Sequence, residues 1–532
     1  GSYLDEFICD DGLVIKAGVT VELSEPLTIT GLAAPFLKVT VILDTGDGGA
    51  ILRGVPFVRA RHVKMMLARK INEVCMLVVV DNTQVEARHE VSADRVVRIR
   101  DLRMTNSAYP EHGYNTKDLL RRGKDYVLTH SPLVCRWKFV QIFDTSLARR
   151  KNSKPVEWEL VRIQEQEADD KYRERSEFLV NKWRGGNITG GSYKTSGSEV
   201  PVIDLRSRTR RGQRQSGKVP LSPGQQYTAG DTFAGAGGAS RGIELAGARL
   251  VFAVDHWDAA AKSLKANFAE DKTTVHTMDI YDFVTSPTIN YRVDLLHLSP
   301  PCQVWSPAHT TPGQNDEMNE ASLWSCTHIV NKVRPRLFTV EQTFGILAPR
   351  FQTHFGLFIA GFTDLGYSVR WKVINLKTFG LAQPRRRVII FGAGPGEKLP
   401  PFPPPTHANG GAGGLKPLTT VRQVLRHVGR ARNDPLHTPK PFDHPRTPWS
   451  PKGLLPNTMT CGGGQNYHWS GKRDFTLREY ALLQGFPAFH QFEAPCIKKQ
   501  IGNAFPPSVV KIFYTHLIAW LDKTDGADPS SR

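Results

Sequence analysis

An alternation of short apolar runs with helical patterns, beginning near residue 230, constrains the fold of this chain more than any other feature. Residues 250–254 and 293–298 are largely apolar runs of strand length, typical of parallel strands that are buried on both faces. Apolar residues at helical spacing follow them, in the sets Leu323, Cys326, Ile329, Val330, Val333 and Phe355, Phe358, Ile359, Phe362, Leu365. This alternation predicts an α/β fold built on a doubly wound sheet.

The sequence before this region has a different pattern. Short apolar or alternating runs such as residues 36–43 and 76–80 are separated by turn signals such as the glycine-rich residues 44–49. We therefore expect a β-rich domain over residues 10–150. Residues 156–183 are charged with sparse apolar positions, Trp158 and Leu160 among them, and we expect them to be helical.

A basic stretch with no acidic residue comes next: Arg206, Arg208, Arg210, Arg211, Arg214 and Lys218. It is interpreted as a solvated linker, as a contact to DNA phosphates or as a nuclear import signal, and the last two do not exclude each other. The predicted organisation is thus a β-rich domain over residues 10–150, a helical connector with a basic linker over 151–225, the α/β domain over 226–522 and a flexible tail over 523–532.

Length and charge narrow the class of protein. A chain of 532 residues is too long for one core, so two or three domains are expected. The formal net charge of +18 suggests a polyanionic partner, of which nucleic acid is the commonest. The seven cysteines form no CxxC pair, so we expect no metal site. There is no signal peptide and no apolar run long enough to cross a bilayer, so we expect a soluble intracellular protein with no membrane partner.

Three segments of the α/β region carry residues suited to binding a ligand. The glycine-rich residues 231–240 follow the first strand of the region and lead into a helix, where glycines let the backbone approach a ligand closely. Asp255 ends the next strand, where a carboxylate can accept hydrogen bonds from ribose hydroxyls. Trp257 lies two residues further on and could stack on adenine, and Asp279 follows the third strand.

A cysteine and a glutamate are expected to meet at the same sheet edge. Cys302 stands in Leu298-Ser-Pro-Pro-Cys302, directly after a buried strand, where ligands bind in open α/β sheets. The next strand, residues 337–340, delivers Glu341 to that edge. The separation of 39 residues (341 − 302) is filled by a loop and one helix, as a parallel crossover requires. The order of the parallel strands therefore brings the nucleophile Cys302 and the acid Glu341 to the same edge of the sheet.

With these segments and three more, the chain resembles the DNA cytosine-C5 methyltransferase family across about 300 residues. The further motifs are Gln383-Pro-Arg-Arg-Arg387, Arg478-Glu-Tyr-Ala-Leu-Leu-Gln-Gly-Phe-Pro487 and Gln500-Ile-Gly-Asn-Ala-Phe-Pro-Pro507, and all stand in the family's usual order. The family's Glu-Asn-Val motif is replaced by Glu341-Gln-Thr343, which together with Trp305 resembles the fungal RID/Masc branch. The change keeps the catalytic carboxylate but alters the packing that the family's Asn supports.

The resemblance implies a Rossmann-like methyltransferase that uses S-adenosylmethionine and forms a covalent bond from Cys302 to a cytosine flipped out of duplex DNA. It implies Cys302, Glu341, Arg385 and Arg387 as catalytic residues. The implied donor site comprises Phe233, Gly235, Gly237, Asp255, Trp257, Asp279, Ile280, Asn503 and Ala504. As DNA contacts we predict Gln303, Ser306, Arg422, Arg426, Gly462, Gly463 and Gly464, the last five within a small target-recognition region over about 395–474.

The β-rich region resembles a bromo-adjacent homology (BAH) domain, on the segments Arg53-Gly-Val-Pro-Phe-Val-Arg59 and Asn72-Glu-Val74. The resemblance to the fungal RID/Masc branch implies a nuclear enzyme of repeat-associated, de novo methylation and gene silencing in a fungus. The BAH-like region implies a histone or chromatin protein as a further partner. Two alternatives remain: a catalytically weak DNA- or chromatin-binding silencing factor, because the acid motif departs from the family, and a tRNA cytosine-5 methyltransferase. The sequence does not indicate the oligomeric state.

Overall fold

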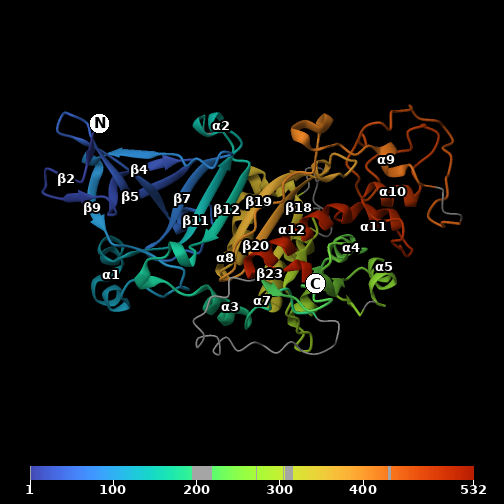
Figure 1. The fold of residues 1–532 in the computed structure, drawn as a ribbon, viewed down its shortest axis with the longest axis horizontal. Coiled ribbons are helices and arrows are strands. Elements are labelled where there is room, and N and C mark those ends of the chain that lie inside the picture. The colour runs from blue at the N-terminus through green and yellow to red at the C-terminus, as the bar shows by residue number, and fades with distance from the viewer. Residues whose placement is uncertain are drawn as a thin grey trace. The chain divides into compact units, whose positions relative to one another are not determined.

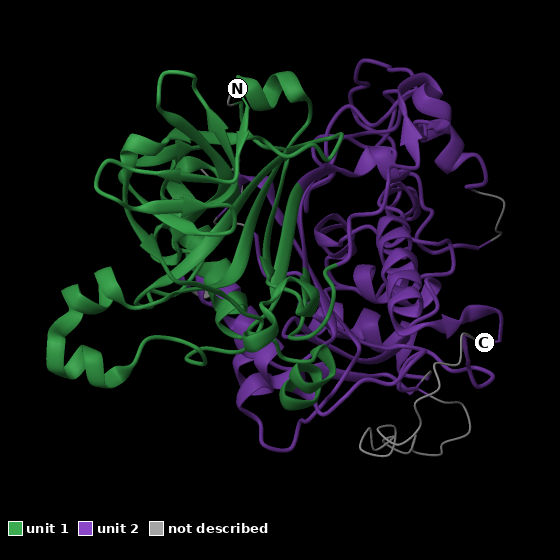
Figure 2. Ribbon diagram, turned by 60° about the vertical axis from the view of Figure 1, so that its left-hand side comes forward, with its two compact units in different colours: residues 1–183, 346–372, 392–399 green, residues 184–345, 373–391, 400–532 purple. Residues whose placement is uncertain are grey.

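The computed structural model describes residues 2–151, 153–193, 218–270, 272–302, 305, 316–428 and 433–531. The chain forms two compact units, of which unit 1 is residues 1–183, 346–372 and 392–399, and unit 2 is residues 184–345, 373–391 and 400–532 (Figure 2). The predicted linker cations from Arg206 to Arg214 and the predicted DNA contacts Gln303 and Ser306 lie outside the described residues.

Unit 1 is rich in β-strands, as the sequence predicts (Figure 1). Neighbouring strands pair mostly antiparallel, β4 with β5 and β9, and β5 with β6, while β7 and β11 pair in parallel. Inward-facing residues such as Val21, Leu37 and Leu52 are fully buried between the strands. The strands and helices that enter the argument are β4 (Thr20–Ile29), β5 (Leu32–Asp44), β6 (Ala50–Arg59), β7 (Glu73–Asp81), β9 (Val96–Arg100), β11 (Leu133–Phe143), α1 (Thr116–His130) and α3 (Ser176–Arg184).

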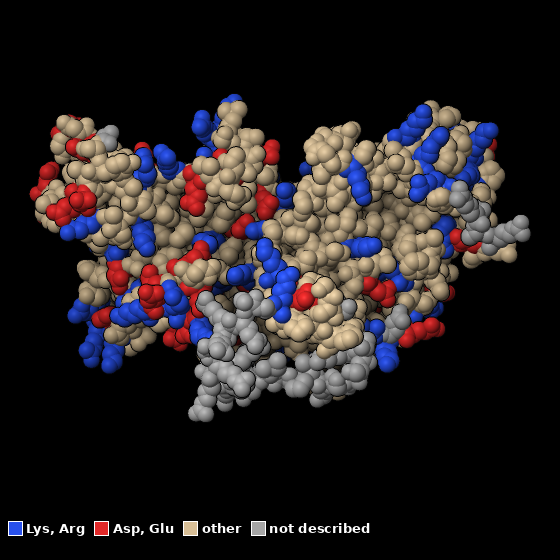
Figure 3. Space-filling model, in the orientation of Figure 1, with Lys and Arg blue, Asp and Glu red and all other residues tan. Residues whose placement is uncertain are grey.

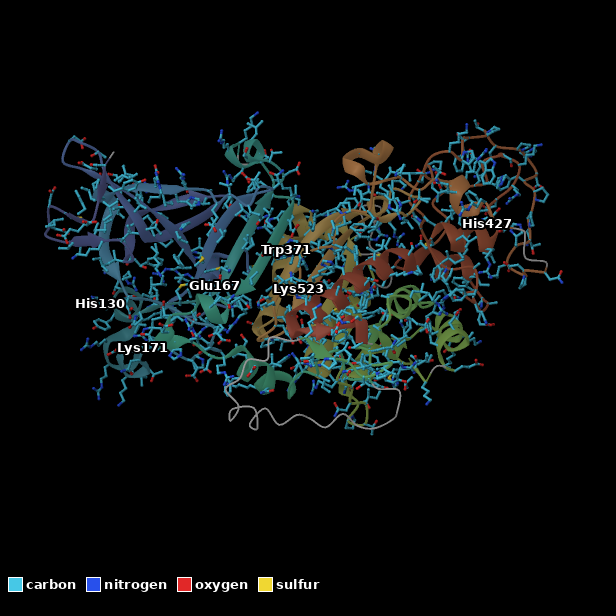
Figure 4. All side chains as sticks on the ribbon, viewed as in Figure 1. His130, Glu167, Lys171, Trp371, His427 and Lys523 are labelled. Atoms are coloured by element: carbon cyan, nitrogen blue, oxygen red, sulfur yellow. The ribbon has the colours of Figure 1, made fainter. Side chains whose placement is uncertain are left out.

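The expected helix over residues 156–183 is wrong for its first part, which is strand β12 (Glu157–Arg162). Burial alternates along this strand, with Trp158 and Leu160 buried and the glutamates between them partly exposed. Trp158 stacks on Trp371, which Figure 4 labels, with ring centroids 6.1 Å apart. The two-residue period of a strand, rather than a sparse helical stripe, explains the spacing of the apolar residues.

Unit 1 also takes in two elements from the region predicted as one α/β domain, α8 (Gln352–Asp364) and the first five residues of β19 (Ser368–Asn375). The Thr363 hydroxyl donates to the Met66 carbonyl oxygen at 2.8 Å, and β19 pairs antiparallel with β12 from Val369 to Lys372. A Cβ placed on Gly356 would stand 2.2 Å from the Lys64 carbonyl oxygen, so α8 packs directly on the loop before β7. These contacts place the two elements in the β-rich unit.

Unit 2 contains a parallel sheet in the order β16-β15-β14-β17-β18. The chain starts in the middle strand, β14, adds β15 and β16 on one side, and then crosses to β17 and β18 on the other. β18 also pairs with β20. This is the predicted doubly wound, Rossmann-like arrangement, and its strand order reverses between β14 and β17. The elements are β14 (Thr228–Thr232), α4 (Gly238–Leu245), β15 (Arg249–Asp255), α5 (Asp258–Phe268), β16 (Thr274–Thr277), α6 (Ile280–Thr285), β17 (Leu295–Leu298), α7 (Asp316–Val333), β18 (Leu337–Thr343), β20 (Arg386–Ala393), α9 (Val421–Leu425), α10 (Leu477–Leu483), α11 (Ile497–Asn503) and α12 (Pro507–Asp525).

The end of the chain differs from the expected flexible tail. Helix α12 runs to Asp525, and β23 (Ala527–Asp528) pairs in parallel with β13 (Val219–Pro220). Ala527 is buried and the Arg336 guanidinium binds both carboxylate oxygens of Asp525 at 2.7 Å. These contacts give residues 523–528 a defined place in unit 2.

Candidate active site

The register of the parallel strands brings the predicted site residues to one edge of the sheet. Thr232, Leu298 and Val340 are partners across β14, β17 and β18. The residue after each of them, Phe233, Ser299 and Glu341, therefore stands at the same carboxyl edge. Because the strand order reverses here, the edge is the place where ligands bind in sheets of this kind.

Cys302 is half-buried in the loop that leaves β17. Burial raises the pKa of its thiol above the ordinary value, while the positive charges of Arg387 and Arg385 act in the opposite direction. The backbone N–H of Trp305 donates to the Cys302 carbonyl oxygen at 3.2 Å, and the Trp305 side chain is buried. The negative charge of Glu341 raises the pKa as well, so the two arginines oppose both burial and the neighbouring carboxylate at this thiol.

Glu341 forms an ion pair with Arg387, whose Nε is 2.5 Å from Oε1 of the carboxylate. The side chains are 10% and 14% exposed, so little solvent screens the pair. Arg387 also donates through Nη1 to the Arg386 carbonyl oxygen at 2.8 Å. The pair fixes the direction of the Glu341 carboxylate at the edge of the sheet where Cys302 stands.

Gln342, which follows the acid in the altered motif, contacts the cysteine loop and its own strand. Its amide nitrogen reaches the Pro300 carbonyl oxygen at 3.4 Å, and its amide oxygen accepts the Thr343 backbone N–H at 2.7 Å. The strand that carries the acid is therefore tied to the loop that carries the cysteine.

Arg385 is buried and bound to backbone. Its Nη1 donates to the Met459 carbonyl oxygen at 2.8 Å, and burial lowers its pKa to about 9, with the charge of Arg387 acting in the same direction. Its Nε is buried and has no hydrogen-bond partner among the described residues. Arg385 thus lies close enough to Cys302 to act on its charge.

Two glutamines tie the arginine motif to the last two motifs of the chain. Gln383 accepts the Met459 backbone N–H at 3.0 Å and donates to the Gln484 side chain at 2.8 Å. Gln484 in turn donates to the Ala504 carbonyl oxygen at 2.7 Å. Three segments distant in sequence are locked together behind the site by amides that the sequence analysis did not single out.

A buried histidine supports the cysteine loop from the strand below. His297 on β17 contacts the Thr339 hydroxyl through Nδ1 at 2.7 Å and the Ser299 hydroxyl through Nε2, three residues before Cys302. Thr339 also contacts the Tyr514 hydroxyl at 2.9 Å. Burial lowers the pKa of His297 to about 3, so the ring is neutral near physiological pH. The sequence analysis assigned it no role, because a histidine inside a buried run has no motif signal.

The glycine-rich loop after β14 is shaped for close approach. Phe233, Gly235 and Gly237 all have positive φ (57°, 56° and 87°), and the space beside Gly235 is open. A Cβ on Gly238 would stand 2.5 Å from the Phe505 carbonyl oxygen, so the loop packs against the segment that holds Asn503 and Ala504. Ala504 is buried, whereas Asn503 is exposed.

Asp255 holds this loop. Its two carboxylate oxygens accept the backbone N–H groups of Gly235 at 2.7 Å and Trp257 at 2.8 Å. Burial raises its pKa above the ordinary carboxyl value. The Lys499 ammonium lies 5.0 Å from the centre of the Trp257 ring, a contact that the sequence analysis missed.

Asp279 caps helix α6 by accepting the Tyr281 backbone N–H at 2.8 Å, and its side chain remains exposed beside the buried Ile280. These groups fit an adenosine-bearing ligand. The carboxylates can accept hydrogen bonds from hydroxyl and amine groups, the indole can stack on a purine, and the open glycine turn leaves space for the ligand. The structure thus groups all nine residues predicted for the donor site in segments at or beside the carboxyl edge of unit 2.

The predicted DNA contacts are less closely grouped. Arg422 and Arg426 are exposed at helix α9 and its end. Gly463 and Gly464 have positive φ and face neighbouring atoms, since a Cβ would stand 2.7 Å from the Lys498 side chain and 2.1 Å from the Thr458 carbonyl oxygen. Only Gly462 of the three faces open space. Two of the glycines are therefore required by internal packing, and the DNA role of the set stays a prediction.

Comparison with known proteins places this site in context. A family model described as "C-5 cytosine-specific DNA methylase" matches residues 227–410 and 415–519. Type II methyltransferase M.NgoFVII of Neisseria gonorrhoeae is 30% identical over 342 residues, which are 56% of this chain and 88% of that protein. DNA (cytosine-5)-methyltransferase 1 of Mus musculus is 30% identical over 223 residues, 39% of this chain and 14% of that protein.

Among solved structures, the S. pombe Dnmt2 methyltransferase superposes with a TM-score of 0.39 at 16% identity, covering 56% of this chain and 99% of that one. Within the described part of the chain, no helix is both long and apolar enough to span a membrane.

Proposed function

Because the chain belongs to the C-5 cytosine-specific DNA methylase family, we propose that it transfers a methyl group to C5 of a cytosine flipped out of duplex DNA. The observation that carries this proposal is the placement of Cys302 at the carboxyl edge together with the Glu341–Arg387 ion pair and the buried Arg385. Nucleophile, acid and cations stand where an aromatic base could be attacked and its charge balanced.

Cys302 is the nucleophile of this reaction. Cytosine is a poor nucleophile at C5, and addition of a thiolate at C6 breaks the ring conjugation and makes C5 electron-rich. Burial opposes ionisation of the thiol, and the charges of Arg387 and Arg385 favour it. The two arginines therefore supply part of the stabilisation that the thiolate needs.

Glu341 would hydrogen-bond the edge of the base that carries N3 and the exocyclic amine. As sulfur adds at C6, charge develops toward N3, and a carboxyl group held there can place a proton on it. Arg387 orients the Glu341 carboxylate through the ion pair between Nε and Oε1, which are 2.5 Å apart. Arg385, with a free Nε and a backbone anchor on Met459, would position the base or the cysteine loop.

S-adenosylmethionine, the methyl donor that the family uses, supplies an electrophilic methyl group when bound. In this chain Asp255 and Asp279 would accept its hydroxyl and amine hydrogens, Trp257 would pack on its purine, and the turn at Gly235 would admit it. Asn503 and Ala504 would close the site from the other side.

The target base must leave the duplex, which costs a few kcal/mol of stacking and pairing. We infer that residues 395–474 read the target, with Arg422 and Arg426 on DNA phosphates or bases and Gly462 at a groove. The nuclear location, the role in silencing repeated DNA in a fungus and a chromatin partner for the β-rich unit are proposals of the same kind. They are supported by the Glu341-Gln-Thr343 motif and by the BAH-like segments of unit 1.

A catalytically weak binding factor is the second candidate, since the acid motif departs from the family. The hydrogen bond from Gln342 to Pro300 and the Glu341–Arg387 pair favour an active enzyme over this reading. Incorporation of tritiated methyl groups into unmethylated duplex DNA, hemimethylated duplex DNA and tRNA tests both. We expect wild type to methylate duplex DNA and the Cys302→Ala variant to have no such activity. Methyl incorporation into tRNA alone would overturn the proposal. So would a protein that binds duplex DNA but incorporates no methyl groups into it.

A further inference from the structure

The β-rich unit holds a cavity of about 420 Å³ whose wall is mainly cationic. Strand β6 ends at it, strand β7 begins at it, and helix α1 contributes one side. The basic residues that line it are Arg59, Arg61, His62, Arg69, Lys70 and Lys124. Figure 3 shows Lys and Arg side chains gathered over α1, and His130 marks the end of that helix in Figure 4.

The negative charge of the lining does not balance these cations. Glu73 is the one acidic residue among those that line the cavity, and it is already paired with the buried Arg136 at 3.3 Å. None of the five Arg and Lys side chains has a carboxylate oxygen within 4 Å of its charged nitrogens in the part of the chain that the structure describes. Nearby, Arg100 is paired with Glu22 at 2.7 Å, so the unit does neutralise a buried cation where it can.

Two of these cations contact neutral groups. The Arg59 guanidinium lies over the Phe36 ring at 5.1 Å and touches the Asn72 side chain at 3.5 Å. The Lys70 ammonium lies over the Tyr109 ring at 4.6 Å. Burial lowers the pKa of Arg59, and the charges of Arg61 and Arg100 lower it further, while the charge of Glu22 acts in the opposite direction. Like charges held together around a hollow form a site with an excess of positive potential.

We propose that this cavity binds a compact ligand that bears one or more phosphate groups. Its volume is in the range of small-ligand pockets. So small a space admits only a few functional groups, and a phosphate carries up to two charges and three acceptor oxygens where a carboxylate carries one charge. Guanidinium forks match phosphate oxygens in pairs, and Arg59, Arg61 and Arg69 provide three of them.

The shape of the site separates this ligand from a DNA backbone. A duplex presents its phosphates along a convex cylinder and is bound by basic stripes or grooves, whereas a cavity receives a group that protrudes or a free small anion. The inference is independent of the methyl transfer proposed for unit 2, because every residue in it belongs to unit 1.

The test uses the full chain and inorganic tripolyphosphate as the probe, with binding measured by titration calorimetry at physiological salt. Wild type is expected to bind one tripolyphosphate saturably. Arg61→Gln combined with Arg69→Gln should weaken binding at least ~10-fold, since each removes a charge-assisted contact. Both side chains are exposed, so the fold should survive.

The matched control is Lys117→Gln combined with Arg121→Gln, which removes the same charge from exposed positions of α1 outside the cavity. It should bind tripolyphosphate as wild type does, and both variants should keep wild-type affinity for a short DNA duplex. Absence of saturable binding by wild type, or equal weakening in both variants, would overturn the proposal. So would a loss of duplex affinity in the cavity variant alone, which would make the cavity part of a DNA track.

Discussion

In unit 2 the cations nearest Cys302 have protein partners, whereas the cations around the cavity of unit 1 form no ion pair with any carboxylate that the structure describes. Arg387 is held by Glu341 at 2.5 Å and Arg385 by the Met459 carbonyl at 2.8 Å. Arg59 and Lys70 rest on aromatic rings beside other cations. The arginines near Cys302 are oriented by partners within the protein. The cations around the cavity would instead be neutralised by a bound anion. Substitutions should therefore act on turnover in unit 2 and on ligand affinity in unit 1.

The largest effect is expected at the acid. Glu341→Gln keeps the size of the side chain but removes the proton-exchanging carboxyl and the ion pair with Arg387, so turnover should fall at least ~100-fold. Affinity for S-adenosylmethionine should change little, because the acids proposed for the donor site, Asp255 and Asp279, are unchanged in this variant. Steady-state methylation and donor binding measure the two.

Glu479→Gln is the control, since Glu479 is a buried carboxylate paired with Arg473 at 2.7 Å within the capping box of α10. It should lower stability and leave turnover at saturating substrate near that of wild type. Near-normal turnover in Glu341→Gln would place the catalytic carboxyl elsewhere.

The next effect concerns pH. Burial lowers the pKa of His297 from 6.5 to about 3, so below pH 6.5 the unfolded chain binds a proton that the folded chain does not. The free energy of unfolding should therefore fall as the pH drops from about 6.5 to about 3, by about 1.4 kcal/mol per pH unit for one such proton. His490, buried with a pKa of about 3, contributes in the same direction.

His297→Gln should remove one of these contributions and flatten the slope of stability against pH by about one proton. Urea unfolding at a series of pH values measures this slope. An unchanged slope would mean that His297 is not the neutral, buried ring described here.

A smaller effect is expected at Gln342. Asn is one methylene shorter and would not reach the Pro300 carbonyl oxygen, so Gln342→Asn should slow turnover by about 2- to 10-fold, the value of one hydrogen bond. Thr343→Val, beside it on β18, is the comparison variant. If Gln342→Asn, alone or with Thr343→Val, gave a faster enzyme, the departure from Glu-Asn-Val would itself limit the rate.

The smallest effect is expected in unit 1. Arg61→Gln with Arg69→Gln removes two exposed cations that form no ion pair with the described residues, so the free energy of unfolding should stay within about 0.5 kcal/mol of wild type and methylation should be unchanged. Urea unfolding without added phosphate provides the measurement. A marked loss of stability would show that these cations support the fold.

The same contrast explains how far the sequence could predict the molecule. In unit 2 Cys302 follows strand β17 and Glu341 lies near the end of strand β18. Parallel register brings the residues after Thr232, Leu298 and Val340 to one edge, so the positions of Cys302 and Glu341 could be predicted from pattern and motif. Asp255 and the glycines of the loop could be placed for the same reason.

Residues whose partners are distant in sequence could not be placed. His297, Gln342 and Gln484 act through hydrogen bonds to groups that only the folded chain brings near. The strand Glu157–Arg162 pairs with both β11 and β19, but its charged sequence with sparse apolar residues favours a helix when the pairing is not known. The cavity of unit 1 is built from a loop, two strand ends and a helix, a combination with no motif.

The central claim, that Cys302 attacks the base, is tested most directly by trapping the adduct. With duplex DNA containing 5-fluorocytosine and with S-adenosylmethionine present, fluorine at C5 blocks the elimination that frees the enzyme, so wild type should form a complex that survives denaturant and migrates as protein joined to DNA. Cys302→Ala should form none while still binding the donor. An adduct that persists in Cys302→Ala, or no adduct in a wild type that methylates duplex DNA, would contradict the account.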